Sequence, residues 1–252
     1  MSVIYDKVAL IGLGLIAGSM SLAMRRAGLA GEIIGTARSP ETRATAARLG
    51  LVDRVVDTTA EAVRDADLVV LAIPVGVMGA VAEEIAPHLK AGSTLSDVGS
   101  VKRHVIETVG PHVPEGVHFI PGHPIAGTEH SGPESGFAEL FDNRWCLLIG
   151  DEATDDDAMA RMKDLWERMG SNVGVMEAEH HDLVLAVTSH APHLIAYTMV
   201  GVADDMARVT DSEVINYSAA GFRDFTRIAA SAVRPMPTPV YISIFGMIAG
   251  WS

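Results

Sequence analysis

The chain has 252 residues, 48% of them hydrophobic and 20% charged, and this composition excludes a disordered or collagen-like protein. At roughly 150 residues per domain, the length predicts one large domain or two modest ones. The 32 acidic and 19 basic residues give a net charge of −13, and the basic residues do not cluster, which argues against nucleic acid as a partner. The single cysteine, Cys146, excludes an internal disulfide and a cysteine-based zinc site, so we expect a cytoplasmic protein.

The apolar stretch at residues 8–24 has a composition close to that of a signal peptide or a membrane span. Gly12, Gly14 and Gly18 interrupt it, and it is shorter than the roughly 20 residues that a spanning helix needs. We interpret it as a strand, a turn and a helix, and we expect neither a targeting segment nor a membrane span.

Short apolar runs alternate with amphipathic stretches along the first 150 residues. The runs typical of buried strands are 8–11, 32–36, 68–73, 94–98, 118–120 and 146–149. The stretches with helical spacing are 19–27, 41–49, 77–89 and 102–112. This alternation predicts an α/β fold with a Rossmann-type, doubly wound parallel sheet in an N-terminal domain of residues 1–150.

The pattern changes after the acidic segment 150–157, which is the best candidate for a linker. Only helical spacing follows, over 158–169 and 177–206, so we expect an all-α C-terminal domain at residues 151–252. Its end is unusual, because three prolines between 235 and 239 lead into an apolar run of about 12 residues. That run is too short to span a bilayer, and we expect it to be buried, for example against a partner subunit.

The first strand and turn contain a dinucleotide-binding pattern, in which Gly12 permits a tight turn and Gly14 lets the backbone approach a pyrophosphate. Ala17 or Gly18 then allows the helix to pack closely on the strand, and the helix N-terminus faces the phosphates. The alternative is a glycine-rich turn without a ligand. The residues that we expect to contact the cofactor here are Gly12, Gly14, Leu15, Ile16, Ala17 and Gly18.

The second strand ends without the acidic residue that usually binds the ribose 2′-hydroxyl of NAD. Thr36 or Ala37 occupies that position, and Arg38 and Ser39 follow. Arg38 can pair with a 2′-phosphate and Ser39 can donate a hydrogen bond to it, which favours NADP over NAD. The alternative is that Arg38 is a solvated surface arginine.

Ligands of open α/β sheets bind beyond the carboxyl ends of the strands. Pro74 follows the strand at 68–73, and Ser100 follows the strand at 94–98, so both are expected at the cofactor and substrate site. Ser100 can exchange a hydrogen bond with the substrate. Lys102 is interpreted as a surface charge in the first turn of the next helix.

His123 lies between Gly122 and Pro124, just after the run 118–120, and we expect it on a rigid loop at this ligand-binding edge. Neutral imidazole is a base near pH 7, so His123 is the candidate catalytic base, although a structural histidine is the alternative.

His190 and His193 are spaced so that they share one face of the long helix. Together with Glu179, His180 and His181 they raise the question of a metal site. We expect none, because His180 and His181 lie several turns from His193 and no carboxylate follows either His190 or His193 at i+4.

Five motifs in order along residues 7–231 resemble the prephenate/arogenate dehydrogenase family. They are GLGLIAGS at 12–19, DVGSVK at 97–102, GHPIAGTEHSGP at 122–133, TSHAPH at 188–193 and GFRDFTRIAAS at 221–231. The resemblance implies NAD(P)-dependent oxidative decarboxylation of prephenate or arogenate, in tyrosine biosynthesis, by a homodimer associated through its helical domain.

The same resemblance implies roles for individual residues. His123 accepts the proton of the ring hydroxyl and Ser100 helps to hold that hydroxyl. Arg227 binds a substrate carboxylate, while His193, His190 and Glu129 face the side-chain end of the substrate or gate the pocket. Arg227 is expected on the apolar side of its helix, where a charged side chain needs a carboxylate partner. The substrate, Glu129 or Asp224 can supply one.

The sequence departs from the family pattern after Ser231, where Asp-Pro and a Met-Trp pair are expected and residues 232–236 read AVRPM. We therefore expect a shortened or altered helical tail, arising from a truncated or frame-shifted coding end, that affects dimer strength and activity. Two alternative functions stay open. One is a 3-hydroxyacid or 6-phosphogluconate dehydrogenase-like enzyme, for which the helical domain offers only Lys163 as a catalytic lysine; the other is a catalytically inactive dinucleotide-binding protein.

Overall fold

The computed structural model describes residues 2–128, 130–207 and 222, so Glu129, Arg227 and the expected altered tail from residue 232 lie outside the described residues. The chain divides into two compact units, Met1–His181 and Asp182–Ser252. The sequence predicts a domain boundary at residue 150, whereas the first compact unit of the structure continues to His181.

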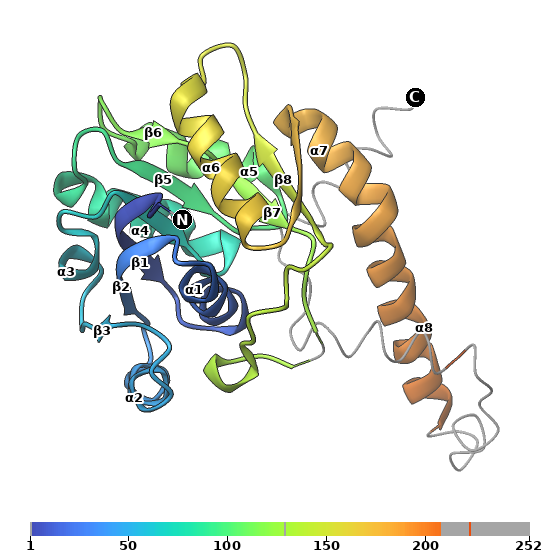
Figure 1. The fold of residues 1–252 in the computed structure, drawn as a ribbon. Coiled ribbons are helices and arrows are strands. Elements are labelled where there is room, and N and C mark those ends of the chain that lie inside the picture. The colour runs from blue at the N-terminus through green and yellow to red at the C-terminus, as the bar shows by residue number, and fades with distance from the viewer. Residues whose placement is uncertain (1, 129, 208–221, 223–252) are drawn as a thin grey trace. The chain divides into compact units, whose positions relative to one another are not determined.

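A six-stranded parallel sheet forms the centre of the first unit (Figure 1). Its strand order, β3-β2-β1-β4-β5-β6, is that of a Rossmann fold, which confirms the predicted fold class. The order reverses between β1 and β4, and a dinucleotide binds at this switch point in such sheets. The strands are β1 (Tyr5–Ile11), β2 (Ala30–Thr36), β3 (Arg54–Val55), β4 (Leu68–Leu71), β5 (Thr94–Asp97) and β6 (His118–Phe119).

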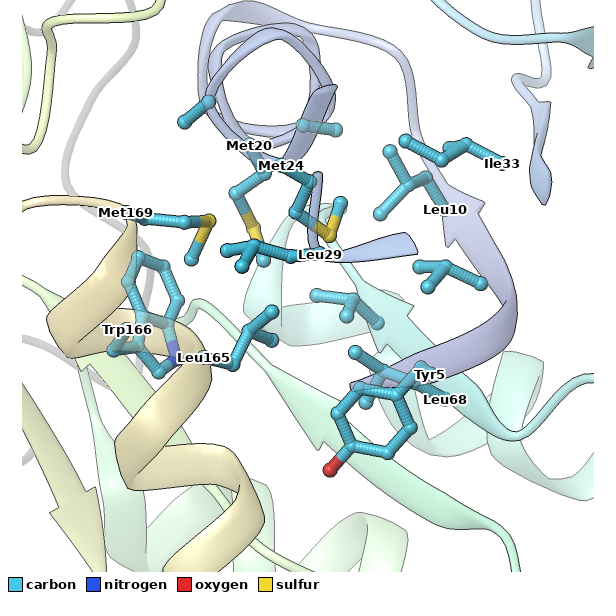
Figure 2. Packing of buried hydrophobic residues seen from close by; sticks show 14 of the residues in the cluster. Tyr5, Leu10, Met20, Met24, Leu29, Ile33, Leu68, Leu165, Trp166 and Met169 are labelled. Atoms are coloured by element: carbon cyan, nitrogen blue, oxygen red, sulfur yellow. The ribbon is translucent and has the colours of Figure 1, made fainter. Parts of the chain in front are cut away.

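Helices cover both faces of this sheet because alternate strand residues point to opposite sides. Val8 and Leu10 belong to one core cluster and Ala9 and Ile11 to the other. The first cluster includes residues of α1 (Leu15–Ala27) and α6 (Asp156–Arg168), and Figure 2 shows Leu165 and Trp166 facing Met20 and Met24. The second includes residues of α3 (Thr59–Val63), α4 (Met78–Ile85) and α5 (Lys102–Val109). The remaining helix of this region is α2 (Pro40–Arg48).

A second sheet of three strands was not foreseen from the sequence. It consists of β7 (Gly122–Pro124), β8 (Trp145–Ile149) and β9 (Asn172–Met176), in which β7 runs antiparallel to β8 and β9 runs parallel to it. The run 146–149 therefore does not join the main sheet as predicted, and the expectation of helices alone after residue 150 was wrong. The two sheets share the first core cluster, which includes Cys146 and Leu148 of β8 as well as Val8 and Leu10 of β1. In the same cluster Trp166 lies edge-on against Phe141, with ring centroids 5.2 Å apart.

The predicted long helix at 177–206 is present as α7 (Ala178–Leu185) and α8 (Ala191–Ala207), joined by a π-helical turn at Ala186–His190. Pro192 explains this turn, since proline has no backbone N–H to donate to the carbonyl one α-helical turn before it. Just before the proline, the N–H of Ala191 donates to the carbonyl of Ala186, five residues earlier, which is the hydrogen bond of a π-helix. The helix thus passes the proline without breaking.

Candidate active site

The glycine turn after β1 has the shape that a pyrophosphate requires. Gly12 has φ +96°, and a Cβ atom there would lie 2.3 Å from the carbonyl oxygen of Ala72, so no side chain fits. Gly14 precedes α1 in an extended conformation, and no described atom lies within 4 Å of the position of a Cβ atom on it. Gly14, the N-cap residue of α1, has no side chain that could accept from the first N–H groups of the helix, and such groups can bind an anion. These features fit a dinucleotide.

Ala17 and Gly18 serve different contacts. Ala17 is buried in the core cluster beneath α1, whereas a Cβ atom on Gly18 would face Leu51 and, at 3.9 Å, the Cα atom of Gly136. The N–H of Phe137 also donates to Ser19 Oγ over 3.1 Å. A Cβ atom on Gly136 would lie 3.2 Å from backbone atoms of Gly18 and Ser19, so it is Gly136 that permits the close packing of its segment against α1. Ala17 takes the contact with the sheet.

The end of β2 carries no carboxylate. Thr36 is buried and its hydroxyl donates to the carbonyl of Val56 over 2.8 Å, whereas Arg38 and Ser39 are exposed. Ser39 Oγ caps α2 by accepting the N–H of Thr42. Arg43, which sequence reasoning missed, donates to the carbonyls of Ala37 and Arg38 over 2.6 and 3.2 Å and so fixes the loop that presents Arg38.

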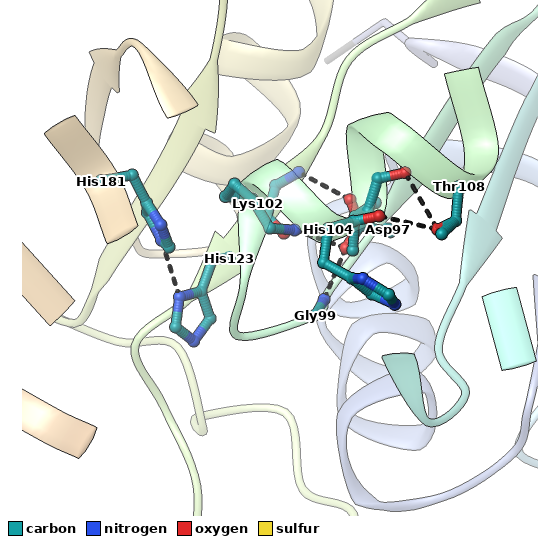
Figure 3. Close-up of polar contacts among 9 residues, drawn as sticks. Asp97, Gly99, Lys102, His104, Thr108, His123 and His181 are labelled. Carbon is teal, nitrogen blue, oxygen red and sulfur yellow. Dashed lines mark hydrogen bonds and ion pairs between the residues drawn. The ribbon is translucent and has the colours of Figure 1, made fainter. Parts of the chain in front are cut away.

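His123 lies on strand β7 and not on a loop as expected, with Leu147 of β8 opposite it. Its Nδ1 atom is 3.0 Å from Nε2 of His181, and the two rings are tilted by 59° (Figure 3). His181 is fully buried and His123 half-buried. Sequence reasoning had weighed His181 only as a possible metal ligand. Its pairing with His123 spans 58 residues of sequence, so no local pattern could reveal it.

Asp97 and Lys102 form a buried ion pair beside His123, and both side chains are fully inaccessible. The interpretation of Lys102 as a surface charge was wrong. Asp97 Oδ2 accepts the N–H of Gly99 over 2.7 Å, and its Oδ1 accepts the N–H of Gly122 over 3.3 Å. Lys102 Nζ donates to the carbonyl of Gly122 over 2.7 Å. The pair therefore joins the segment at 97–102, which carries the half-buried Ser100, to the residue before His123.

The other predicted site residues lie as follows. Pro74 is exposed and directly precedes a 3-10 turn at Val75–Val77, at the carboxyl edge of β4. In the second unit, His190 is buried in the π turn, and His193 Nδ1 donates to the carbonyl of Ser189 over 2.8 Å. Among the described residues, no group of three or more His, Cys, Asp or Glu side chains is arranged to hold a metal ion.

Comparison with known proteins gives a consistent result. A family model described as the nucleotide-binding domain of prephenate dehydrogenase matches residues 20–175, and one described as the dimerization domain of prephenate dehydrogenase matches residues 177–236. The cyclohexadienyl dehydrogenase of Zymomonas mobilis is 42% identical over 231 residues, which are 92% of this chain and 78% of that protein. The prephenate dehydrogenase of Bacillus subtilis is 34% identical over 92% of this chain, and the alignment covers 62% of that protein.

A solved structure agrees with these relatives. The prephenate dehydrogenase of A. aeolicus, crystallised in complex with hydroxyphenyl propionate and NAD+, aligns with a TM-score of 0.86 and 30% sequence identity. The alignment covers 100% of this chain and 87% of the other. Taken with the glycine turn at the switch point of a Rossmann sheet, these likenesses identify this chain as a member of the prephenate dehydrogenase family.

Proposed function

We propose that this chain catalyses the NAD(P)-dependent oxidative decarboxylation of prephenate or arogenate. The observation that carries the proposal is the contact between His123 and His181, whose ring nitrogens lie 3.0 Å apart. His123 lies on strand β7, in a chain that belongs to the prephenate dehydrogenase family. A dehydrogenation of this kind needs a base that accepts the hydroxyl proton of the substrate. A nicotinamide held by the glycine turn would supply the hydride acceptor, and loss of carbon dioxide would leave an aromatic ring.

The base in this proposal is Nε2 of His123. When Nδ1 of His123 carries its proton and donates to Nε2 of His181, the lone pair of His123 resides on Nε2, where it can accept a proton. His181 then selects the tautomer and fixes the angle of the His123 ring. Ser100, on the adjacent segment 97–102, donates to or accepts from the same substrate hydroxyl.

The residues proposed to hold the dinucleotide are those of the glycine turn, with Pro74 at the edge of β4. We propose a preference for NADP, supported by the missing carboxylate at the end of β2 and by exposed Arg38. A charge-assisted hydrogen bond contributes roughly 1.5 to 3 kcal/mol to binding. Because Arg38 is exposed to solvent, we take the low end of this range, which corresponds to about tenfold in affinity. Arg38→Ala should then reduce kcat/KM for NADP selectively, and Ala37→Asp should shift the preference towards NAD.

The wild type and both variants, assayed with each cofactor, test this preference. A wild type that strongly prefers NAD, or an Arg38→Ala variant that uses NADP as well as the wild type does, would show that Arg38 is only a surface charge. Arg48→Ala is a matched comparison, because it removes another exposed arginine, from the helix that follows Arg38, that pairs with Glu134.

The substrate residues proposed from the family motifs are Arg227, which binds a carboxylate, and His193, His190 and Glu129, which lie towards the side-chain end. Arg227→Ala should raise KM more than it lowers kcat, because the substrate anion loses a charged partner. A variant that loses its fold instead would indicate that Arg227 belongs to a structural ion pair.

The activity itself is tested by following cofactor reduction at 340 nm with prephenate, arogenate and a set of 3-hydroxyacids. Turnover of prephenate or arogenate supports the proposal and identifies the preferred substrate. Turnover of 3-hydroxyacids alone would support the alternative dehydrogenase class. The candidate catalytic lysine of that class, Lys163, forms an ion pair with Glu167 on α6. Cofactor binding without any turnover would support an inactive dinucleotide-binding protein.

A homodimer formed through the helical domain is part of the proposal, in a cytoplasmic enzyme. The match to a dimerization domain at residues 177–236 supports it, and three apolar side chains of that region, Val187, Ile195 and Val202, are more than half exposed. By length and composition alone, the helical stretch Ala178–Ala203 could also cross a membrane. Sedimentation of the purified protein distinguishes a dimer from a monomer, and detergent dependence would favour the membrane alternative.

A further inference from the structure

Burying the ion pair between Asp97 and Lys102 costs desolvation free energy, because both charges are removed completely from water. A buried pair recovers its desolvation cost only partly, and apolar residues of similar volume often give equal or greater stability. Stability alone therefore does not account for these two residues. Their hydrogen bonds indicate what else they do.

Both polar groups of Gly122 are held by the pair. Its N–H donates to Asp97 Oδ1 over 3.3 Å, and its carbonyl accepts from Lys102 Nζ over 2.7 Å (Figure 3). That carbonyl belongs to the peptide bond whose nitrogen is His123, so Lys102 limits rotation of the peptide plane that carries His123. Strand β7 has only three residues and lies at the edge of its sheet, so within that sheet it pairs with β8 alone.

The same carboxylate also shapes the segment that carries Ser100. Asp97 Oδ2 accepts the N–H of Gly99 over 2.7 Å, two residues after Asp97 itself. A Cβ atom on Gly99 would lie 2.9 Å from that oxygen and 2.9 Å from Val75 Cγ2, so the turn is closely packed around the carboxylate. One buried pair thus sets the backbone before His123 and the backbone before Ser100.

We propose that Asp97 and Lys102 are positioning residues that align His123 and Ser100 with each other and with the substrate hydroxyl. The inference rests on the proposed function, in which those two side chains meet the substrate. Neither Asp97 nor Lys102 touches the reacting atoms, because both are buried. Their contribution is therefore to the geometry of proton transfer, where a displacement of about 1 Å can cost roughly 100-fold in rate.

The test is the double variant Asp97→Leu/Lys102→Met, which removes the hydrogen bonds without leaving an unpaired buried charge. We expect a folded protein that binds NADP(H) within about twofold of the wild-type affinity, since the glycine turn is untouched. Its single-turnover rate should fall by roughly 10- to 100-fold, with KM changed less than about threefold. The limb of the pH–rate profile that reports the base should persist, whereas His123→Asn should lose it.

Two further variants complete the test. Asp97→Asn keeps an acceptor for Gly99 but turns an amide donor towards Gly122, and it should lower the rate by about tenfold even if the double variant does not fold. Arg103→Met/Glu107→Leu removes an exposed ion pair of 3.7 Å from the same helix and should leave the rate unchanged. A rate within twofold of wild type in a folded Asp97 variant would overturn the inference, as would equal losses in the control. A wild type inactive on both acids would overturn the proposed function and this inference with it.

Discussion

Replacing Gly12 or Gly14 by alanine should have different consequences, although both glycines belong to the same cofactor turn. At Gly12, with φ +96°, an alanine costs roughly 1–2 kcal/mol in backbone strain. Its Cβ atom would also lie 2.3 Å from the carbonyl oxygen of Ala72, where real contacts start near 3.0 Å, so β1 and β4 must separate by about 0.7 Å. Together we expect about 2–4 kcal/mol of destabilisation.

Gly14→Ala is the matched variant, because no described atom lies within 4 Å of its Cβ position and its backbone is extended. The free protein should keep its stability to within about 1 kcal/mol, the usual cost of alanine at a helix N-cap. The added methyl group instead occupies the path by which a pyrophosphate approaches the turn. We expect its affinity for NADP(H) to fall by at least about tenfold.

Thermal unfolding of the free proteins and titration with NADPH separate the two effects. Gly12→Ala should lower the Tm by roughly 5–15 °C, and Gly14→Ala by a few degrees at most. Equal Tm losses in the two variants would refute the structural reasoning about the turn. Wild-type affinity in Gly14→Ala would refute the position assigned to the pyrophosphate.

The remaining predictions concern single side chains. His123→Asn should lower kcat by about 10² to 10⁴ without changing affinity for NADP(H), and wild-type turnover would exclude it as the base. Burial raises the pKa of the Cys146 thiol, so a thiol reagent at pH 8 should modify it at least about 100-fold faster after unfolding in urea than before; equal rates would contradict its burial. Burial opposes the shift, but hydrogen bonds from Lys90 and from the N–H of Lys7 hold the pKa of Asp67 below its usual value. The ionised carboxylate therefore stabilises the fold above the unfolded pKa, and this contribution is lost as the pH falls through the folded pKa. Urea unfolding of Asp67→Asn should show a deficit at pH 7 that shrinks below about pH 4, whereas a deficit independent of pH would contradict the role of charge.

Most of the main sheet could be predicted from the sequence, because strands such as β1, β2 and β4 contain continuous apolar runs that are buried. Residues 68–71 are an example, since all four are buried. The edge strand β3, which has only two residues and no buried one, was missed. The strands that were missed lack this signal. β7 is GHP, with a glycine and a proline in three residues, and β9 is NVGVM, with its central glycine. Their pairing depends on partners distant in the sequence.

The site was predictable in its residue types but not in its contacts. His123 and Ser100 follow strands, and the rule that ligands bind at carboxyl edges is enough to select them. Lys102 was misjudged because the first turn of a helix is usually solvent-exposed, and its burial depends on β7, which has no local signature. His181 was missed as the partner of His123 for the same reason, since only the folded chain brings β7 and the start of α7 together.

The three-stranded sheet has a consequence for the order in which the protein can assemble. All six strands of the main sheet have been synthesised once Phe119 is made, and the glycine turn lies within them. His123 has no strand partner until residues 146–148 follow, and His181 comes later still. The core cluster on the Val8 and Leu10 face of the main sheet is complete only after Phe141 and Trp166 have also been synthesised. A growing chain thus has all the residues of its nucleotide turn well before the groups that align His123, and over that interval the apolar face of Val8 and Leu10 lacks its full cover.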